Sequence, residues 1–216
     1  RYCALPAICR DERFSYLLDP HQYTVVKLSS HWVIQTWEAA MKTNTLPNYD
    51  MNDAPTGCCP RFNPDGWDDQ DLHFEDKLFV RATTKSNHYV PVDMGEVFQA
   101  TFSAIENAGA FDVKDFIVLS RDVAPSEAEH FFAVAKPVPG LEMAQWSGDC
   151  LTKVHEGPYV KTAEWQNDVL KLVESRGHEV ARTFYFYTTC PKCAESYGKN
   201  YIVAIAELAD AVGHPT

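Results

Sequence analysis

The sequence lacks the features of a membrane-bound or nucleic-acid-binding protein. No apolar run approaches the roughly 18 residues that a membrane-spanning helix needs, and no basic segment followed by an apolar run opens the chain. Clusters of Lys and Arg are also missing, and the formal net charge of the 216 residues is -11. Because phosphate backbones are held by clustered cations, we expect no nucleic-acid partner, no membrane partner and a cytoplasmic location.

The chain lacks the even set of cysteines that a fully disulfide-bonded scaffold would use, because it has seven, an odd number. A chain of this length with 45% hydrophobic residues buries a sizeable core without such bonds. Cys190 and Cys193 lie in an expected turn between two strands, where a zinc knuckle would lie, and Cys58 and Cys59 can supply two more thiolates.

Three interpretations of these cysteines stay open: a structural zinc site, a redox pair and local packing. Adjacent cysteines such as Cys58 and Cys59 seldom bind one metal ion together, and no second Cys-x-x-Cys pair completes the usual spacing. The strand-helix-strand context of thioredoxin-like redox sites is missing as well. We therefore expect no cofactor and no catalytic metal, with structural zinc at Cys190 and Cys193 as the alternative.

Two amphipathic helices are expected in the second half of the chain. The first covers Gly95–Ala108 and ends before Gly109; the second covers Ala163–Arg176 and ends before Gly177, 68 residues after the first stop. Both place apolar residues at spacings of three and four. One helix is expected at each position.

Each helix is preceded by one expected strand and followed by two. The expected strands are Asn87–Val92, Phe116–Ser120, Phe131–Lys136, Leu151–Glu156, Arg182–Thr188 and Tyr201–Glu207. Phe184 follows Phe116 by 68 residues, and Tyr201 follows Phe131 by 70. The prediction is an α+β fold made of duplicated strand-helix-strand-strand modules, about 86–138 and about 150–208, with pseudo-twofold symmetry and antiparallel sheets. Chance similarity of two ordinary α/β segments is the alternative.

The first 57 residues have no counterpart in this repeat, so we assign residues 1–57 to an N-terminal extension of unknown role. Tyr23–Leu28 is expected to be a strand and Ser30–Lys42 an amphipathic helix. Asn48–Pro64 is rich in Asn, Asp, Pro and Gly and is expected to be irregular.

Several runs of residues together resemble the GyrI-like effector-binding domains, over about Cys58 to Leu208. The runs are Lys153-Val-His-Glu-Gly-Pro-Tyr159, Cys58-Cys-Pro-Arg-Phe62, Asp76-Lys-Leu-Phe79, Tyr187-Thr-Thr-Cys-Pro-Lys-Cys-Ala194 and Tyr197-Gly-Lys-Asn200. The last four are similar to those of a bacterial subgroup that stands alone, without a DNA-binding domain. The resemblance assigns residues 58–216 to a GyrI-like domain.

This resemblance implies a ligand cleft between two like modules, lined by aromatic residues and one or more carboxylates. Members of the family either sense amphiphilic, often cationic drugs or hydrolyse reactive compounds, and some stand-alone members open the strained cyclopropane of DNA-alkylating natural products. The family expectation is thus a hydrolase acting in detoxification or self-protection. A non-catalytic domain that binds or sequesters a drug is the alternative, and an interaction module held by zinc is a third.

Alternation along Arg182–Thr188 gives the expected cleft a tyrosine wall. Phe184 and Phe186 share one face, which suits packing under the helices, while Tyr185 and Tyr187 share the other and suit a wall that meets a ligand. A half-exposed sheet capped by tyrosines is the alternative. Further candidates for the ligand wall are Trp146, Trp165, Tyr89, Met94 and Phe98. Of these, Trp165 lies on the buried stripe of its helix and is more often a core residue.

Glu156 and Tyr187 are the candidate catalytic residues. Glu156 ends a strand against Gly157, with His155 on the opposite face, and partial burial would raise its pKa so that it can act as a general acid or activate water. The phenol of Tyr187 would steady the leaving oxygen. An exposed strand-end acid is the alternative. Drug-sensing relatives place a glutamate on the last strand, whereas this chain has none there before Glu207, which favours hydrolysis over sensing of cations.

Overall fold

The computed structural model describes residues 23–28, 31–36 and 43–209, which fall into two units. In the first unit, β1 (Tyr23–Leu28) and β2 (His31–Thr36) form an antiparallel hairpin. The strand predicted over Tyr23–Leu28 is confirmed. The helix predicted over Ser30–Lys42 is wrong at His31–Thr36, which pairs with β1 and whose β-branched residues Val33 and Ile34 suit a strand. The rest of that predicted range lies outside the described residues.

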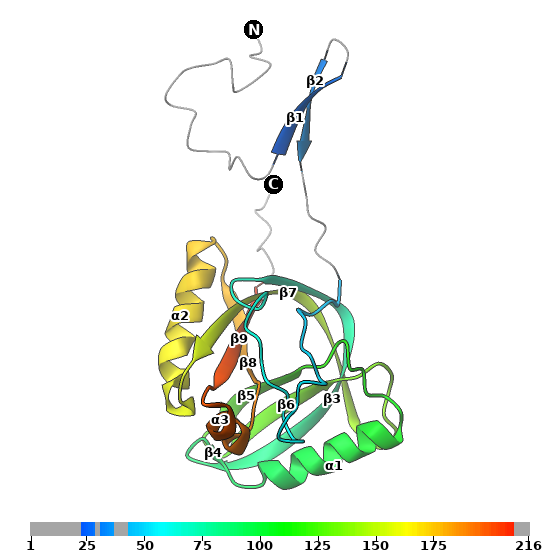
Figure 1. Ribbon diagram of the computed structural model, residues 1–216, viewed down its shortest axis with the longest axis vertical. Helices are drawn as coiled ribbons and strands as arrows, with labels where there is room; N and C mark the ends of the chain where they lie inside the picture. Colours follow the sequence, from blue (N-terminus) through cyan, green and yellow to red (C-terminus); the bar gives the residue numbers. More distant parts are fainter. Residues whose placement is uncertain (1–22, 29–30, 37–42, 210–216) are drawn as a thin grey trace. The chain divides into compact units, whose positions relative to one another are not determined.

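The second unit is an antiparallel sheet that closes into a six-stranded barrel (Figure 1). Its strands are β3 (Asp71–Asn87), β4 (Val90–Pro91), β5 (Val118–Ala124), β6 (Glu127–Ala133), β7 (Glu142–Glu156), β8 (Val180–Tyr187) and β9 (Tyr201–Leu208). The strand order is β4-β3-β6-β5-β8-β9-β7, and β7 pairs back with β3 while the short β4 pairs only with the end of β3. The α+β class and the antiparallel pairing are therefore confirmed.

Both predicted helices are present within one residue of the expected bounds and lie on the outside of the barrel. They are α1 (Met94–Asn107) and α2 (Thr162–Ser175). Ile105 of α1 packs against Val80 of β3 and Phe132 of β6, whereas Val169 of α2 packs against Leu151 of β7 and Ala204 of β9. The short α3 (Pro191–Tyr197) lies in the connection between β8 and β9. None of the described helices has the length and hydropathy needed to cross a membrane.

The strand predicted over Asn87–Val92 is wrong. β3 ends at Asn87, and the chain then reverses through His88 and Tyr89, both with positive φ, into β4, the two-residue strand that precedes α1. Two left-handed residues between paired strands are typical of a tight hairpin turn. The module bounds of about 86 and about 150 therefore leave out most of β3 and the first half of β7, since β7 begins at Glu142.

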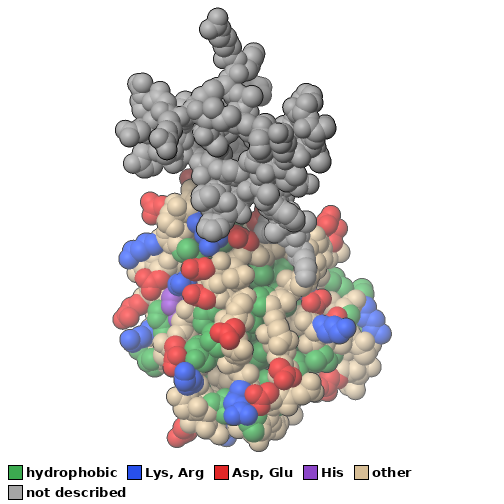
Figure 2. Space-filling view, turned by 45° about the horizontal axis from the view of Figure 1, so that its top comes forward, with side chains coloured by type: hydrophobic (Ala, Val, Ile, Leu, Met, Phe, Trp, Pro, Cys, Tyr) green, Lys and Arg blue, Asp and Glu red, His purple; other side chains and the backbone are tan. Residues whose placement is uncertain are grey.

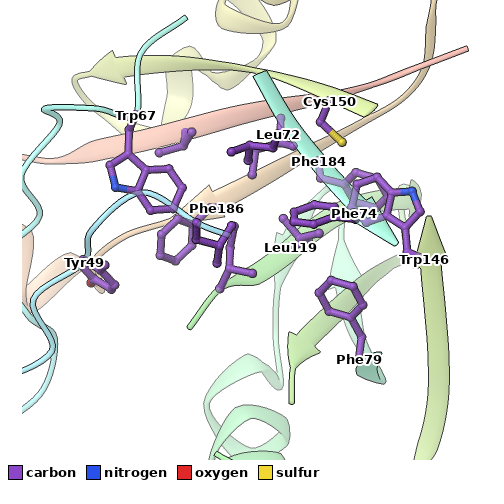
Figure 3. Packing of buried hydrophobic residues seen from close by; sticks show 14 of the residues in the cluster. Tyr49, Trp67, Leu72, Phe74, Phe79, Leu119, Trp146, Cys150, Phe184 and Phe186 are labelled. Atoms are coloured by element: carbon purple, nitrogen blue, oxygen red, sulfur yellow. The ribbon is translucent and has the colours of Figure 1, made fainter. Parts of the chain in front are cut away.

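Aromatic side chains fill the interior of the barrel (Figure 3). Tyr49, Phe62 and Trp67 come from the irregular segment before β3 and pack against Phe186 of β8. Burial of one such side chain contributes about 1.5–3 kcal/mol to folding. Residues 43–57, which we assigned to the N-terminal extension, thus contribute Leu46 and Tyr49 to the same core, and the Tyr49 hydroxyl donates to the Thr188 carbonyl oxygen at 2.8 Å.

Candidate functional site

The outer face of the barrel between α1 and α2 carries polar and aromatic side chains in place of a continuous apolar surface. In the strand order, β5 and β8 are the central pair. On one side of them lie β6 and β3, which contact α1, and on the other side lie β9 and β7, which α2 covers. Cross-strand partners point to the same face, so the pairs His130↔Ser120 and Ser120↔Tyr185 put these three residues together. Alternation adds Asp122 and Tyr187. We call these five residues the inter-helix face.

Two tyrosines and one carboxylate lie close together on this face. The rings of Tyr185 and Tyr187 are 6.2 Å apart, and the ring of Tyr159 is 6.0 Å from that of Tyr187. Burial raises the pKa of Tyr187 to about 12 and also raises the pKa of Tyr185, and the nearby charge of Asp122 adds to both shifts. Burial also raises the pKa of Asp122. Both phenols are therefore neutral hydrogen-bond donors at neutral pH, beside a carboxyl group that is easier to protonate than usual.

A buried histidine lies next to them. His130 accepts or donates one hydrogen bond on each ring nitrogen, to Ser120 Oγ at 2.9 Å and to Thr84 Oγ1 at 2.8 Å, and the ring of Phe98 packs on it at 4.8 Å. Burial lowers the pKa of His130 to about 4, so the imidazole is neutral at neutral pH. Within residues 43–209, the buried hydroxyl of Ser86 on the neighbouring β3 has no hydrogen-bond partner.

Residues predicted to line the ligand wall are only partly brought together. Phe98 covers His130, and the half-buried Met94 begins α1. Tyr89 lies in the β3–β4 turn and is 57% exposed. Trp165 is a buried residue of α2, and its ring stacks on that of His155 with 5.1 Å between the ring centroids, which agrees with its interpretation as a core residue.

Two expectations about aromatic residues are wrong. Trp146 is a core residue inside the barrel, because β7 turns it inward against Phe74 and Phe184. Phe184 and Phe186 do not lie under the helices. They fill the barrel, and Tyr185 instead packs toward α2. Side chains fill the interior of a small closed barrel, so the purely apolar rings of Phe184 and Phe186 point inward.

The two predicted catalytic residues are not brought together. Glu156 is not buried as expected, since its side chain is 52% exposed and its Oε2 lies 3.7 Å from Lys199 Nζ. It shares its face with its cross-strand partner Tyr201, whereas Tyr187 pairs with Ile202 and lies on the other face. The partial burial expected of Glu156 is therefore absent, and Glu156 and Tyr187 do not face one common site.

Two carboxylates were missed or misjudged from the sequence. The expected strand Phe116–Ser120 ended too early, and its continuation to Ala124 as β5 brings Asp122 to the same face as Ser120. Alternation carried two residues further would have found it. Glu207 on the last strand is buried in the barrel, where it accepts hydrogen bonds from Trp146 Nε1 at 2.8 Å and from Arg182. Arg182 therefore pairs with this internal acid across β8 and β9.

A small cavity lies near the end of the barrel at Tyr201. Its volume is about 90 Å³, and its lining residues are Arg61, Phe62, Thr188, Thr189, Tyr197, Lys199 and Tyr201. Sites for drug-sized molecules have volumes of about 300–1,000 Å³. This cavity is therefore too small for a flat polycyclic compound.

The four cysteines considered as metal ligands meet on one side of the second unit. Cys58, Cys59, Cys190 and Cys193 place every pair of Sγ atoms within 4.8 Å. On the face of the protein shown in Figure 2, Lys and Arg side chains are interspersed with Asp and Glu side chains.

Comparison with known proteins yields one family match. A family model described as bacterial hydrolase matches residues 49–208. No curated protein matches the chain significantly in sequence. Two solved structures from Listeria innocua are similar in fold: an uncharacterized conserved protein with 9% identity covers 66% of this chain and 93% of its own, with a TM-score of 0.49. The second, a hydrolase with 12% identity, covers 66% of this chain and 92% of its own, with a TM-score of 0.47.

Proposed function

The chain belongs to the bacterial hydrolase family, and on this basis we propose that it hydrolyses a hydrophobic, electrophilic small molecule bound at the inter-helix face. The observation that carries the proposal is the position of Asp122 beside Tyr185 and Tyr187. A carboxyl group with a raised pKa near two neutral phenols is the kind of constellation that binds and activates a substrate.

The order of the elements supports the interpretation as a GyrI-like domain with two related modules. β3, α1, β5 and β6 are followed by β7, α2, β8 and β9. If β3 corresponds to β7, β5 to β8 and β6 to β9, the strand order β3-β6-β5-β8-β9-β7 becomes the same when it is read from its other end. That is the relation a twofold axis between β5 and β8 would produce, and the inter-helix face lies on this axis.

The chemistry assigned to this face is addition of water to a strained or polarised carbon. The ionised carboxylate of Asp122 takes a proton from water as the water oxygen bonds to the electrophilic carbon. The bond from that carbon to its leaving atom breaks, and the electron pair moves onto an oxygen of the substrate. The phenol of Tyr187 donates a hydrogen bond to this oxygen while charge develops on it. The oxygen then takes a proton from solvent, and Asp122 releases the proton it accepted.

A cyclopropane conjugated to a carbonyl group, as in DNA-alkylating natural products, is the substrate class we propose. Attack on the ring carbon breaks a strained carbon–carbon bond, and the carbonyl oxygen receives the electron pair. The rings of Tyr185, Tyr187 and Phe98 would hold the flat scaffold by offset stacking. Hydrolysis of such a compound would protect DNA from alkylation.

Mass spectrometry of a cyclopropane-bearing alkylator incubated with the protein tests this proposal. We expect catalytic conversion to the ring-opened product that has gained one water. Survival of excess alkylator would refute turnover, and binding without conversion would support the sequestering function instead. Asp122→Asn and Glu156→Gln form a matched pair of variants. Loss of turnover in the first alone supports the assignment to Asp122, whereas loss in the second alone returns the role to Glu156.

A further inference from the structure

Four cysteine sulfurs from two distant segments of the chain converge at a place separate from the inter-helix face. Cys58 and Cys59 belong to the irregular segment before β3, and Cys190 and Cys193 lie at the start of α3. The Sγ atoms of Cys58 and Cys59 are 3.7 Å apart, and those of Cys58 and Cys190 are 4.0 Å apart. The backbone brings four soft ligands to one point.

The separations fit a tetrahedral metal site. Zinc–thiolate bonds of about 2.3 Å in a regular tetrahedron put the sulfurs roughly 3.8 Å apart. The observed 3.7 and 4.0 Å agree with this spacing. A disulfide would need its two sulfurs about 2.05 Å apart, so the present arrangement is one of four separate thiols. Tetrahedral sulfur sets of this kind favour zinc, with iron as the chemical competitor.

Neighbouring groups hold the sulfurs in place, as the outer shell of a metal site does. The backbone N–H of Cys190 donates to Cys59 Sγ at 3.3 Å. Thr56 Oγ1 lies 3.2 Å from Cys193 Sγ and 2.9 Å from Tyr197 Oη. The Tyr197 hydroxyl in turn donates to the Cys59 carbonyl oxygen at 2.6 Å. These contacts link the two cysteine pairs even without an ion.

We propose that Cys58, Cys59, Cys190 and Cys193 bind one structural zinc ion. Four thiolates complete the tetrahedral coordination and leave no position for a reactive water, so the ion has no part in hydrolysis. The adjacent Cys58 and Cys59 follow a turn at Gly57, which has φ +67°, and their Sγ atoms lie 3.7 Å apart. The sequence expectation for adjacent cysteines did not include this local turn.

The zinc would fasten the irregular segment to the barrel. Residues 43–67 have no strand or helix of their own beyond an isolated bridge from Thr43 to His73, yet they supply Tyr49, Phe62 and Trp67 to the core. A metal cross-link between this segment and α3 closes a loop of more than 100 residues and removes chain entropy from the unfolded state. Loss of the ion should therefore loosen the packing of Tyr49, Phe62 and Trp67 inside the barrel.

Metal analysis of the full-length protein, purified under reducing conditions, tests the proposal. We expect one zinc per chain, with little iron. Replacement by cobalt should give the absorption bands of a tetrahedral thiolate site, and removal of zinc with a chelator should lower the midpoint of thermal unfolding of the unmodified chain. Protein that is folded, reduced and free of zinc, with no uptake of zinc or cobalt on titration, would overturn the proposal, as would stoichiometric iron.

Two cysteine variants give a matched comparison. Cys58→Ser alters an exposed ligand and should reduce bound zinc well below one per chain while the barrel still folds. Cys150→Ala removes a buried thiol of the barrel core outside the cluster and should leave the zinc content unchanged. Equal zinc in the two variants would contradict the assignment. A mass lower by two hydrogens, from a bond between two of the four sulfurs in freshly purified protein, would replace the metal site with a disulfide.

Discussion

Ser120 of β5 and Tyr185 of β8 are the only cross-strand partners that join these two strands within residues 43–209. Every other seam of the barrel has between six and nine such partners. On the outer face, Asp122 lies two residues beyond this pair in one direction along the strands, and Tyr187 lies two residues beyond it in the other. The candidate catalytic groups thus flank the seam with the fewest backbone pairs. A ligand that separates the two strands there would break the fewest strand-to-strand hydrogen bonds.

The pH dependence of turnover should follow the ionisation of Asp122. Burial raises the pKa of this carboxyl group, and only its ionised form can take a proton from water. Activity should therefore be lost, as pH falls, at a higher pH than an ordinary aspartate would give. A profile of kcat/KM against pH measures this. If Asp122→Asn keeps both full activity and the same acidic limb, Asp122 is not the base.

Tyr187→Phe should lower kcat by about 10²-fold, while KM changes little, because a single donor to a developing oxyanion contributes about that much. The phenyl ring retains the stacking surface. Steady-state kinetics with the alkylator measures both constants. Tyr159→Phe is the control, since the Tyr159 hydroxyl donates to the Thr189 carbonyl oxygen at 2.7 Å and is already occupied. Equal losses of kcat in both variants would argue against a specific role of Tyr187.

His130 should make the protein less stable in mild acid. Burial lowers its pKa from 6.5 to about 4, so below pH 6.5 the unfolded chain takes up a proton that the folded chain does not. The free energy of unfolding should therefore fall between about pH 6.5 and about pH 4, by roughly 3 kcal/mol from this group. Urea unfolding at several pH values measures the slope.

The comparison variant for this prediction is His130→Gln, which keeps hydrogen-bonding capacity toward Ser120 and Thr84 but has no such proton. It should show a smaller slope over the same pH range. The same change at the exposed His178 is the control and should keep the slope of the unmodified protein. A slope unaffected by His130→Gln would mean that other groups cause the acid sensitivity.

Gly157→Ala should destabilise the protein by about 1–3 kcal/mol, because it adds backbone strain and a close contact. Gly157 has φ +147°, and an added Cβ would lie 3.2 Å from Trp165 Cζ2. Gly177→Ala is the matched control: its φ is +78°, but nothing lies within 4 Å of the added carbon. Urea unfolding should rank Gly157→Ala as the more destabilising change. The reverse order would show that the contact with Trp165 relaxes freely.

Local patterns in the sequence were sufficient for α1 and α2 and for parts of β5 to β9. Apolar spacing and the glycine stops located α1 and α2 within one residue, since amphipathic periodicity and a left-handed stop are properties of neighbouring residues. Alternation correctly separated Tyr185 and Tyr187 from Phe184 and Phe186. The failures at His31–Thr36 and at Asn87–Val92 arose where short apolar runs fit either a helix or a strand, or where a turn interrupts them.

By itself, the sequence determined which residues form α1 and α2, which faces of β8 are phenolic or purely apolar, and which cysteines are available. Only the tertiary structure decided which face points into the barrel, because that depends on the pairing of β3 with β7, whose partners Asp71 and Leu151 lie 80 residues apart. It also brought Cys58 to Cys190, left Glu156 beside Lys199, and set Asp122 near enough to the tyrosines for its charge to raise their pKa values. These contacts join residues that are distant in the chain, and no local periodicity encodes which distant segments become neighbours.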